Sequence, residues 1–144
     1  MLKAVYSRSL KSAQSLSENL KDVNLYSDDS GPGKTYHDLL LRDDIQAVII
    51  VLPIMKQAEF IEAALAAGKH VLSEKPIAET IQRAERLFQF SKSNKVKGGA
   101  TWSVAENYRY VEAYRVAAAE VKKLGKILGF RVQNFVSIPN ICKC

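Results

Sequence analysis

The run Ala47-Val48-Ile49-Ile50-Val51-Leu52, which Pro53 follows directly, decides the fold class of this chain. Its residues are all apolar, and polar positions do not alternate with apolar ones. A strand of a parallel sheet has this character when helices cover both of its faces, because neither face then meets water. Proline ends such a strand, since it has no backbone N–H to donate. The run therefore predicts a strand of a parallel α/β sheet, covered on both faces.

Strand-like and helix-like segments alternate on both sides of this run. Short apolar segments predict further strands at Leu2–Tyr6, His70–Ser73 and Val96–Val104. Apolar residues at helical spacing predict helices after the N-cap Ser9, after the capping-box pair Thr35 and Asp38, at Lys56–Ala67 before Gly68, and at Glu79–Ser93. Parallel strands need long crossover connections, and helices supply them. This order predicts a doubly wound, Rossmann-like α/β fold.

The pattern changes after a further predicted helix, Tyr110–Leu124, which Gly125 follows. Apolar residues then alternate with polar or small ones, at Leu128, Phe130, Val132, Val136 and Ile138. This period of two is typical of a half-exposed antiparallel strand. We therefore expect residues 1–125 to form the α/β domain and residues 126–144 to begin a different, α+β domain. Since no partner strand follows, we expect this strand to be poorly supported or to pair with another chain.

The composition is that of an ordinary globular domain. The 144 residues are 47% hydrophobic and 25% charged, and the net charge of +6 admits anionic partners such as phosphorylated cofactors. The lysines are scattered, so binding of nucleic acid is not expected. No apolar run is long enough for a membrane helix and no signal pattern is present, so we predict a cytoplasmic location. Cys142 and Cys144 alone would leave a zinc site incomplete, so we expect no metal.

The stretch His70-Val71-Leu72-Ser73-Glu74-Lys75-Pro76 carries the most chemical information. A buried strand here delivers an acid, a base and a rigid proline to its carboxyl end, where ligands bind in open α/β sheets. A lysine at that place can donate a hydrogen bond or a proton to a substrate oxygen. The alternative is that Glu74 and Lys75 form a surface pair that opens a helix, and the residues alone do not decide between the two.

Three motifs together resemble one enzyme family. They are Glu74-Lys75-Pro76 after a short strand, the preceding Ala63-Ala64-Leu65-Ala66-Ala67-Gly68-Lys69-His70, and Ala105-Glu106-Asn107-Tyr108-Arg109-Tyr110. Their order and spacing resemble the Gfo/Idh/MocA oxidoreductases along nearly the whole chain, from Leu2 to Ile138. The resemblance implies a Rossmann domain for a nicotinamide dinucleotide, and hydride transfer to or from a sugar, a polyol or a cyclic alcohol.

The resemblance also implies roles for individual residues. Lys75 would contact the reacting oxygen of the substrate as the catalytic, proton-relaying residue, while Glu74 and Pro76 would shape the loop near the nicotinamide. Leu52 and Pro53 would contact the cofactor at the place where the family carries a Thr-Pro pair.

Other positions depart from the family or have a structural alternative. The family's Asn and His after the Thr-Pro pair are here Ile54 and Gln57, so cofactor contacts there are in doubt. Arg109 would lie near the nicotinamide site, unless it forms a structural ion pair with Glu106 or Glu112.

The segment Ser7-Arg8-Ser9 lies where this family reads the adenosine ribose. An acid there favours NAD by bonding the 2′-hydroxyl, whereas Arg8 between two hydroxyls suits a 2′-phosphate. NADP is therefore the preferred cofactor and NAD the second. The alternative is that Arg8 is a solvated residue at the start of a helix.

Two parts of the family pattern have no counterpart in this sequence. One is the first strand with its Gly-x-Gly-x-x-Gly turn, and the other is the domain that supplies an Asp and a His to the active site. His37 and His70 belong to the dinucleotide half, and we expect both to be structural. Three hypotheses remain open: an active oxidoreductase, a truncated and catalytically inactive fragment, or an interaction module that self-associates through its C-terminal strand.

The lack of a first strand also has a structural consequence. The predicted strands Leu2–Tyr6 and Ala47–Leu52 would miss the neighbour that normally separates them. Either they close up, or an apolar slot stays open between them.

Overall fold

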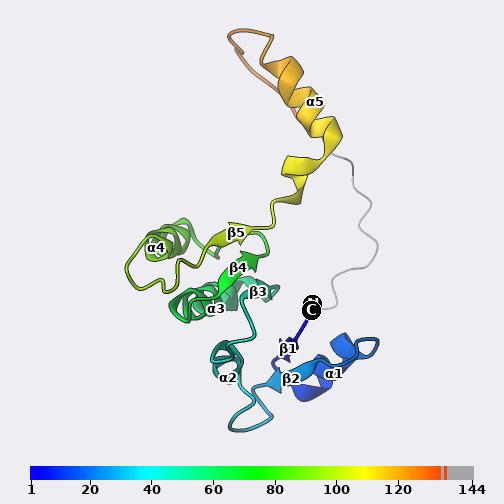
Figure 1. Cartoon of the computed structure of the whole chain (residues 1–144). Coiled ribbons are helices and arrows are strands. Elements are labelled where there is room, and N and C mark those ends of the chain that lie inside the picture. Colours follow the sequence, from blue (N-terminus) through cyan, green and yellow to red (C-terminus); the bar gives the residue numbers. More distant parts are fainter. Residues whose placement is uncertain (134, 136–144) are drawn as a thin grey trace. The chain divides into compact units, whose positions relative to one another are not determined.

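The computed structural model describes residues 1–133 and 135. The chain forms two compact units, Met1–Glu106 and a second unit that begins at Asn107 (Figure 1). The elements of the first unit are β1 (Ala4–Ser7), α1 (Leu10–Ser17), β2 (Asn24–Ser27), α2 (Tyr36–Leu40), β3 (Ala47–Ile50), α3 (Ile54–Ala66), β4 (His70–Ser73), α4 (Ile81–Ser91) and β5 (Trp102–Val104).

The strands form two sheets, and every pairing is parallel. β1 pairs with β2, and Tyr6 lies opposite Tyr26. β4 lies between β3 and β5, so that Ser73 is opposite both Ile50 and Val104. A helix follows β1, β2, β3 and β4 in turn, as the crossovers of parallel strands require. The predicted Rossmann-like α/β fold is confirmed.

The helix-capping interactions that the sequence predicts are present in the structure. The Ser9 hydroxyl accepts a hydrogen bond from the backbone N–H of Ser12 at 3.2 Å and caps α1. Thr35 and Asp38 form the predicted capping box at the start of α2. Gly68 follows α3 with a φ of 77°, a conformation that costs little only for glycine.

Some predicted boundaries are wrong. β3 ends at Ile50, and Pro53 serves as the N-cap residue of α3, which begins two residues earlier than predicted. β5 contains only Trp102–Val104, because Gly98 and Gly99 take φ values of 59° and 66° that an extended strand does not allow.

The main core lies between one face of the strands and the helices α2, α3 and α4. Its fully or nearly fully buried members include Ile50, Ile61, Leu65, Val71 and Leu87. Ala13 of α1 is also fully buried but lies outside this cluster, because α1 packs on the other face of β1 and β2. Considered as a set, the strands therefore have α2, α3 and α4 on the core face and α1 on the other face, at β1 and β2.

The two sheets are joined by aromatic packing. Tyr6 of β1, Tyr36 of α2 and Phe60 of α3 have ring centroids 4.5–5.5 Å apart. The Tyr36 hydroxyl also donates a hydrogen bond to the Phe60 carbonyl at 3.1 Å. Desolvation by burial raises the pKa of both tyrosines, so the rings stay neutral.

The prediction that helices cover both faces of β3 is wrong for the described residues. Ile50 is buried, whereas Ile49 is 74% exposed and Val51 is 71% exposed. The side chains of a strand alternate between its two faces, and α3 and α4 pack on the face of Ile50 only. An apolar face of β3 is therefore left uncovered.

The strands β1 and β3 do not pair, and a groove of about 880 Å³ lies between them. Of the two outcomes expected for these strands, the open slot is the one observed. Most of its lining is apolar, from residues 1–6 of the β1 region, residues 45–52 of the β3 region, and Leu16, Tyr36, Leu39 and Phe60 of the neighbouring helices.

The second unit contains a 3-10 helix, Asn107–Tyr110, and the helix α5, Glu112–Val121. The central part of the predicted helix Tyr110–Leu124 is thus confirmed. Residues 126–133 form no strand, and Val136 and Ile138 of the predicted pattern lie outside the described residues. The predicted domain boundary at residue 125 stays a prediction. In the part of the chain that is described, no helix has the length and apolar character to span a bilayer.

The buried face of α4 gives a test of this packing. We expect Leu87→Ala to lower the free energy of unfolding by about 2–5 kcal/mol, because Leu87 is fully buried and its loss leaves a cavity. Ile81→Ala on the same helix is the control, since Ile81 is 76% exposed, and it should change stability by less than about 0.5 kcal/mol. Urea unfolding of both variants measures this, and equal effects would contradict the assigned core.

Candidate functional site

The carboxyl ends of parallel strands meet at one edge of a sheet, and the predicted site residues of the first unit follow such ends. Ser7 ends β1, Leu52 follows β3, and Glu74 follows β4. Their neighbours Arg8, Ser9, Pro53, Lys75 and Pro76 occupy the connections that come next in the chain. Each of these residues thus lies at or just after the carboxyl end of a strand, where ligands bind in open α/β sheets, although β1 belongs to one sheet and β3 and β4 to the other.

The Glu74-Lys75-Pro76 loop is held by its backbone. The Glu74 N–H donates to the Ile50 carbonyl at 2.9 Å, which extends the ladder between β3 and β4. The Lys75 N–H donates to the Glu74 carboxylate at 3.0 Å. Lys75 itself is exposed, so its ammonium group faces solvent and can reach a bound molecule.

Gln57 of α3 ties this loop to the neighbouring helix. Its side chain is 1% exposed, and its Nε2 donates to the Pro76 carbonyl at 2.7 Å. Its Oε1 is buried without a hydrogen-bond partner among the described residues. Sequence reasoning left the role of Gln57 in doubt, and its place in the first turn of α3, after the end of β3, is the signal that points to this edge.

Two further contacts hold the elements that flank the loop. Buried Ser73, which precedes Glu74, accepts a hydrogen bond from the Trp102 indole N–H at 2.9 Å. Arg83 of α4 donates two hydrogen bonds, of 2.9 and 3.0 Å, to the Glu62 carboxylate of α3, so the helices that precede and follow β4 in the chain are joined.

The ends of β1 and β2 carry polar side chains that sequence reasoning missed. Ser27 is fully buried, and its hydroxyl donates to the Asp29 carboxylate at 2.6 Å. Asp29 also accepts from the Leu10 backbone N–H at 2.8 Å, at the start of α1. The bonds from Ser27 and Leu10 hold the pKa of Asp29 below its usual range. Arg8 is exposed just before this helix start.

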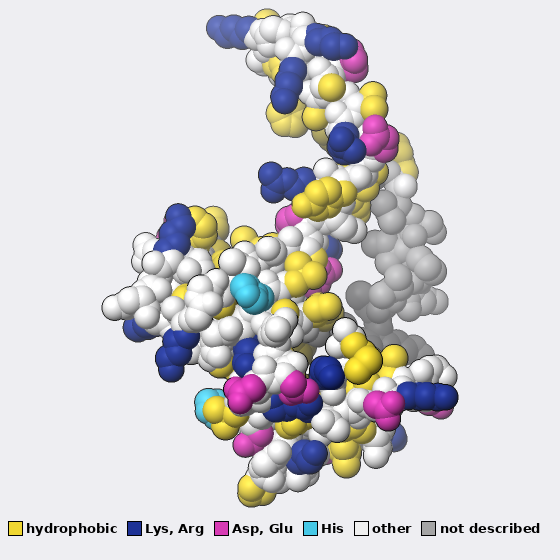
Figure 2. Space-filling view, viewed as in Figure 1, with side chains coloured by type: hydrophobic (Ala, Val, Ile, Leu, Met, Phe, Trp, Pro, Cys, Tyr) yellow, Lys and Arg dark blue, Asp and Glu magenta, His cyan; other side chains and the backbone are white. Residues whose placement is uncertain are grey.

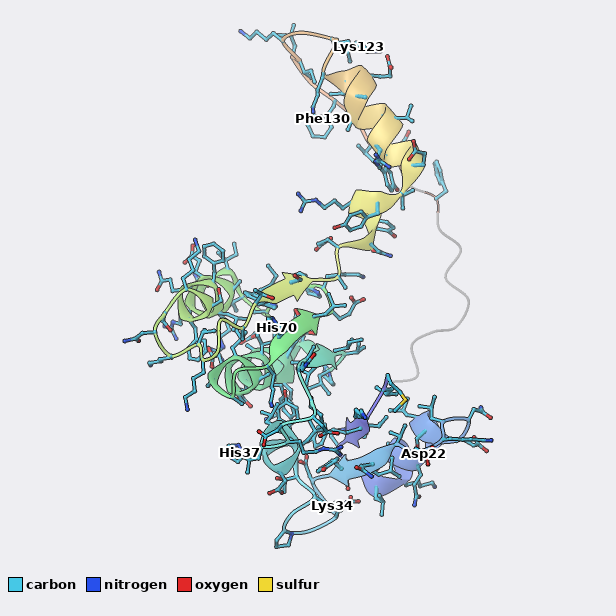
Figure 3. All side chains as sticks on the ribbon, viewed as in Figure 1. Asp22, Lys34, His37, His70, Lys123 and Phe130 are labelled. Atoms are coloured by element: carbon cyan, nitrogen blue, oxygen red, sulfur yellow. The ribbon has the colours of Figure 1, made fainter. Side chains whose placement is uncertain are left out.

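The remaining predicted residues belong to other elements of the chain. Arg109 belongs to the 3-10 helix of the second unit and is exposed. His70 lies at the amino end of β4, away from Lys75, and its Nδ1 is hydrogen-bonded to the Thr101 hydroxyl at 2.9 Å. Figure 3 shows His70 on the sheet and His37 on α2. The side-chain contact of His70 is therefore a structural one, between neighbouring strand segments.

Lys and Arg side chains do not gather over one element on the face of the molecule that Figure 2 shows. Figure 2 shows Lys and Arg side chains spread over several elements, with Asp and Glu among them. Within residues 1–133 and 135, no three His, Cys, Asp or Glu side chains are grouped so that they could hold a metal ion.

Comparison with known proteins agrees with this geometry. A family model described as "Oxidoreductase family, NAD-binding Rossmann fold" matches residues 1–100. The dehydrogenase FPY6 of Fusarium mangiferae is 44% identical over 135 residues, which cover 91% of this chain and 38% of that protein. The chain therefore spans little more than a third of the length of this relative.

Solved structures give the same picture. KijD10, a 3-ketoreductase from Actinomadura kijaniata in complex with TDP-benzene and NADP, is 30% identical, with a TM-score of 0.67 and 85% of this chain and 35% of that chain covered. The scyllo-inositol dehydrogenase of Lactobacillus casei, with NAD(H) and scyllo-inositol bound, is 29% identical, with a TM-score of 0.67 and 85% and 33% covered. On its fold, its motifs and these matches, the chain belongs to the Gfo/Idh/MocA family of NAD-binding oxidoreductases.

Proposed function

We propose that this chain binds a nicotinamide dinucleotide across the carboxyl ends of β1, β3 and β4, and that Lys75 relays a proton during hydride transfer. The observation that carries the proposal is the fixed backbone of the Glu74-Lys75-Pro76 loop. Hydrogen bonds from Glu74 to β3 and from Gln57 to the loop hold it, while the Lys75 side chain stays exposed. A rigid backbone with a free ammonium group suits a residue that must meet a substrate oxygen.

The residues present fit the two ends of such a cofactor. Arg8 is exposed at the end of β1, whereas the Ser9 hydroxyl caps α1, so Arg8 is available for a 2′-phosphate. Asp29, the acid beside it in the fold, is already bonded to Ser27 and to Leu10. This arrangement supports NADP as the preferred cofactor. No glycine directly follows β1 or β3, so the described residues offer no close approach for a pyrophosphate there.

The proposed substrate is a sugar, a polyol or a cyclic alcohol. When bound, the nicotinamide accepts or supplies the hydride at the carbon that carries the hydroxyl or carbonyl group. Lys75 takes the hydroxyl proton when the alcohol is oxidised and returns a proton to the oxygen when the carbonyl is reduced. Pro53, Glu74 and Pro76 shape the wall beside it, and the role of Arg109, which belongs to the second unit, stays a prediction.

A second candidate function is that of an interaction module without catalysis of its own. Such a module would self-associate through the C-terminal segment of the chain. The cytoplasmic location also stays a proposal.

Cofactor choice is the first test. We expect calorimetric titration to give tighter binding of NADPH than of NADH, by about tenfold, since Arg8 pairs with the extra phosphate. Arg8→Asp should remove that preference, whereas Arg86→Asp, the same charge change on an exposed residue of α4, should keep it. A folded chain that binds neither cofactor would contradict the proposal.

Lys75 is the second test. We expect Lys75→Met to lower turnover of scyllo-inositol with NADP by about 10²–10⁴-fold, because general acid–base catalysis is lost. NADPH affinity should change by no more than about threefold, since the loop backbone is held by Glu74 and Gln57. A chain that binds NADPH but turns over neither scyllo-inositol nor glucose would favour the inactive fragment.

The third test concerns loop positioning by Gln57. We expect Gln57→Met, which keeps the side-chain size but removes the donor to Pro76, to speed amide exchange at Lys75 and Ile77 by about tenfold. Gln82→Met is the control, because Gln82 is exposed on α4. Hydrogen exchange followed by NMR measures both, and unchanged exchange in Gln57→Met would show that the bond does not hold the loop.

A further inference from the structure

Arg8 lies in the short connection between β1 and α1, and the loop that follows β2 runs beside it. The parallel register places Ser7 opposite Ser27, so this loop starts at the level of Arg8. Its first two residues, Asp28 and Asp29, both carry carboxylates. We infer that these two acids are positioning residues, which hold Arg8 in place for the 2′-phosphate of the cofactor without pairing with it. The inference rests on the proposed function, in which Arg8 binds that phosphate.

The two acids bind the chain on either side of Arg8. Asp28 accepts a hydrogen bond from the hydroxyl of Tyr6, two residues before Arg8, at 2.6 Å. Asp29 accepts a hydrogen bond from the backbone N–H of Leu10, two residues after Arg8, at 2.8 Å. Arg8 is thus bracketed by two contacts with one loop. Because the chain is held on both sides, the places that the Arg8 side chain can reach are restricted.

A chain of hydroxyl groups supports the contact of Asp29. A carboxylate only accepts hydrogen bonds, so the fully buried Ser27 hydroxyl donates to Asp29, at 2.6 Å. A hydroxyl has one proton to donate, so Ser30 is the donor in its contact with Ser27. The bonds from Ser27 and Leu10 hold the pKa of Asp29 below its usual range, which keeps this carboxylate ionised. The position of Asp29 is therefore fixed from two directions.

These contacts leave the guanidinium group of Arg8 available. Arg8 is exposed, and within residues 1–133 and 135 it takes part in no ion pair. Both neighbouring carboxylates are engaged by other donors. A pair between Arg8 and a carboxylate would occupy the N–H groups that a phosphate needs, since both anions bind the same face of the guanidinium.

The two carboxylates also oppose the phosphate electrostatically, because like charges repel. Position and charge thus act in opposite directions, and substitutions of Asp29 can separate them. Asp29 accepts both of its bonds with one oxygen, Oδ1. Asp29→Asn keeps that oxygen and removes the charge, whereas Asp29→Ala removes both. The two variants should therefore change phosphate binding in opposite directions.

The experiment titrates the whole chain with adenosine 2′,5′-bisphosphate and with 5′-AMP, which differ only in the 2′-phosphate. We expect the wild-type chain to prefer the bisphosphate by about tenfold. Asp29→Ala should lower this preference at least about fivefold, because Arg8 loses its fixed place. Asp29→Asn should raise it about threefold, since the positioning bonds stay and a repelling charge is gone. Asp43→Ala, at an exposed acid after α2, is the charge control and should change it by less than about 1.5-fold.

Amide exchange gives a second readout, which needs no nucleotide. We expect Asp29→Ala to speed exchange of the Leu10 amide by about tenfold, and Asp29→Asn to leave it within about threefold. Tyr6→Phe keeps the ring in the aromatic cluster but removes the donor to Asp28. It should lower the preference for the bisphosphate by about two- to threefold, because one of the two contacts beside Arg8 is lost.

The outcomes separate this inference from the proposed function. If the wild-type chain prefers the bisphosphate and Asp29→Ala keeps that preference, the inference is wrong and the proposed NADP site stands. Equal weakening of both nucleotides by Asp29→Ala would show that Asp29 only stabilises the fold, and an equal rise in both Asp29 variants would assign the effect to charge alone. A folded wild-type chain without preference for the 2′-phosphate would contradict the proposed NADP site, and the inference with it.

Discussion

The packing of Tyr6, Tyr36 and Phe60 is the contact on which the first unit depends. β1 and β3 share no hydrogen bond, so the two sheets are held in one body by side chains. Aromatic pairs at these distances contribute about 0.5–1.5 kcal/mol each beyond the apolar area they bury. The proposed cofactor site involves the carboxyl ends of β1 and β3, which belong to different sheets, so it depends on this cluster as well.

Much of the first unit could be predicted because its signals are local. The capping residues Ser9 and Thr35 and the terminating Gly68 act within one turn of a helix, and they appear where the sequence places them. The order of strands and helices follows from the same kind of pattern. The position of the Glu74-Lys75-Pro76 loop could also be predicted, because strand β4 is short, largely apolar and directly followed by the charged pair Glu74 and Lys75.

The features that could not be predicted from the sequence depend mainly on contacts between distant segments. The bond from Gln57 to Pro76 spans 19 residues, and nothing in the local pattern specifies it. The exposed face around Ile49 was missed because six apolar residues in a row look the same whether one face or two are covered. The glycines at 98 and 99 were placed in a strand, although two adjacent glycines are also typical of a turn.

The hydrogen bond between Trp102 and Ser73 has a spectroscopic consequence. Trp102 is the only tryptophan of the chain, and its indole N–H is bonded to the residue directly before Glu74. Indole emission depends on the polarity and hydrogen bonding around the ring. The intrinsic tryptophan fluorescence of this protein is therefore an optical signal from one place, beside the end of the strand that precedes Lys75, and needs no added label.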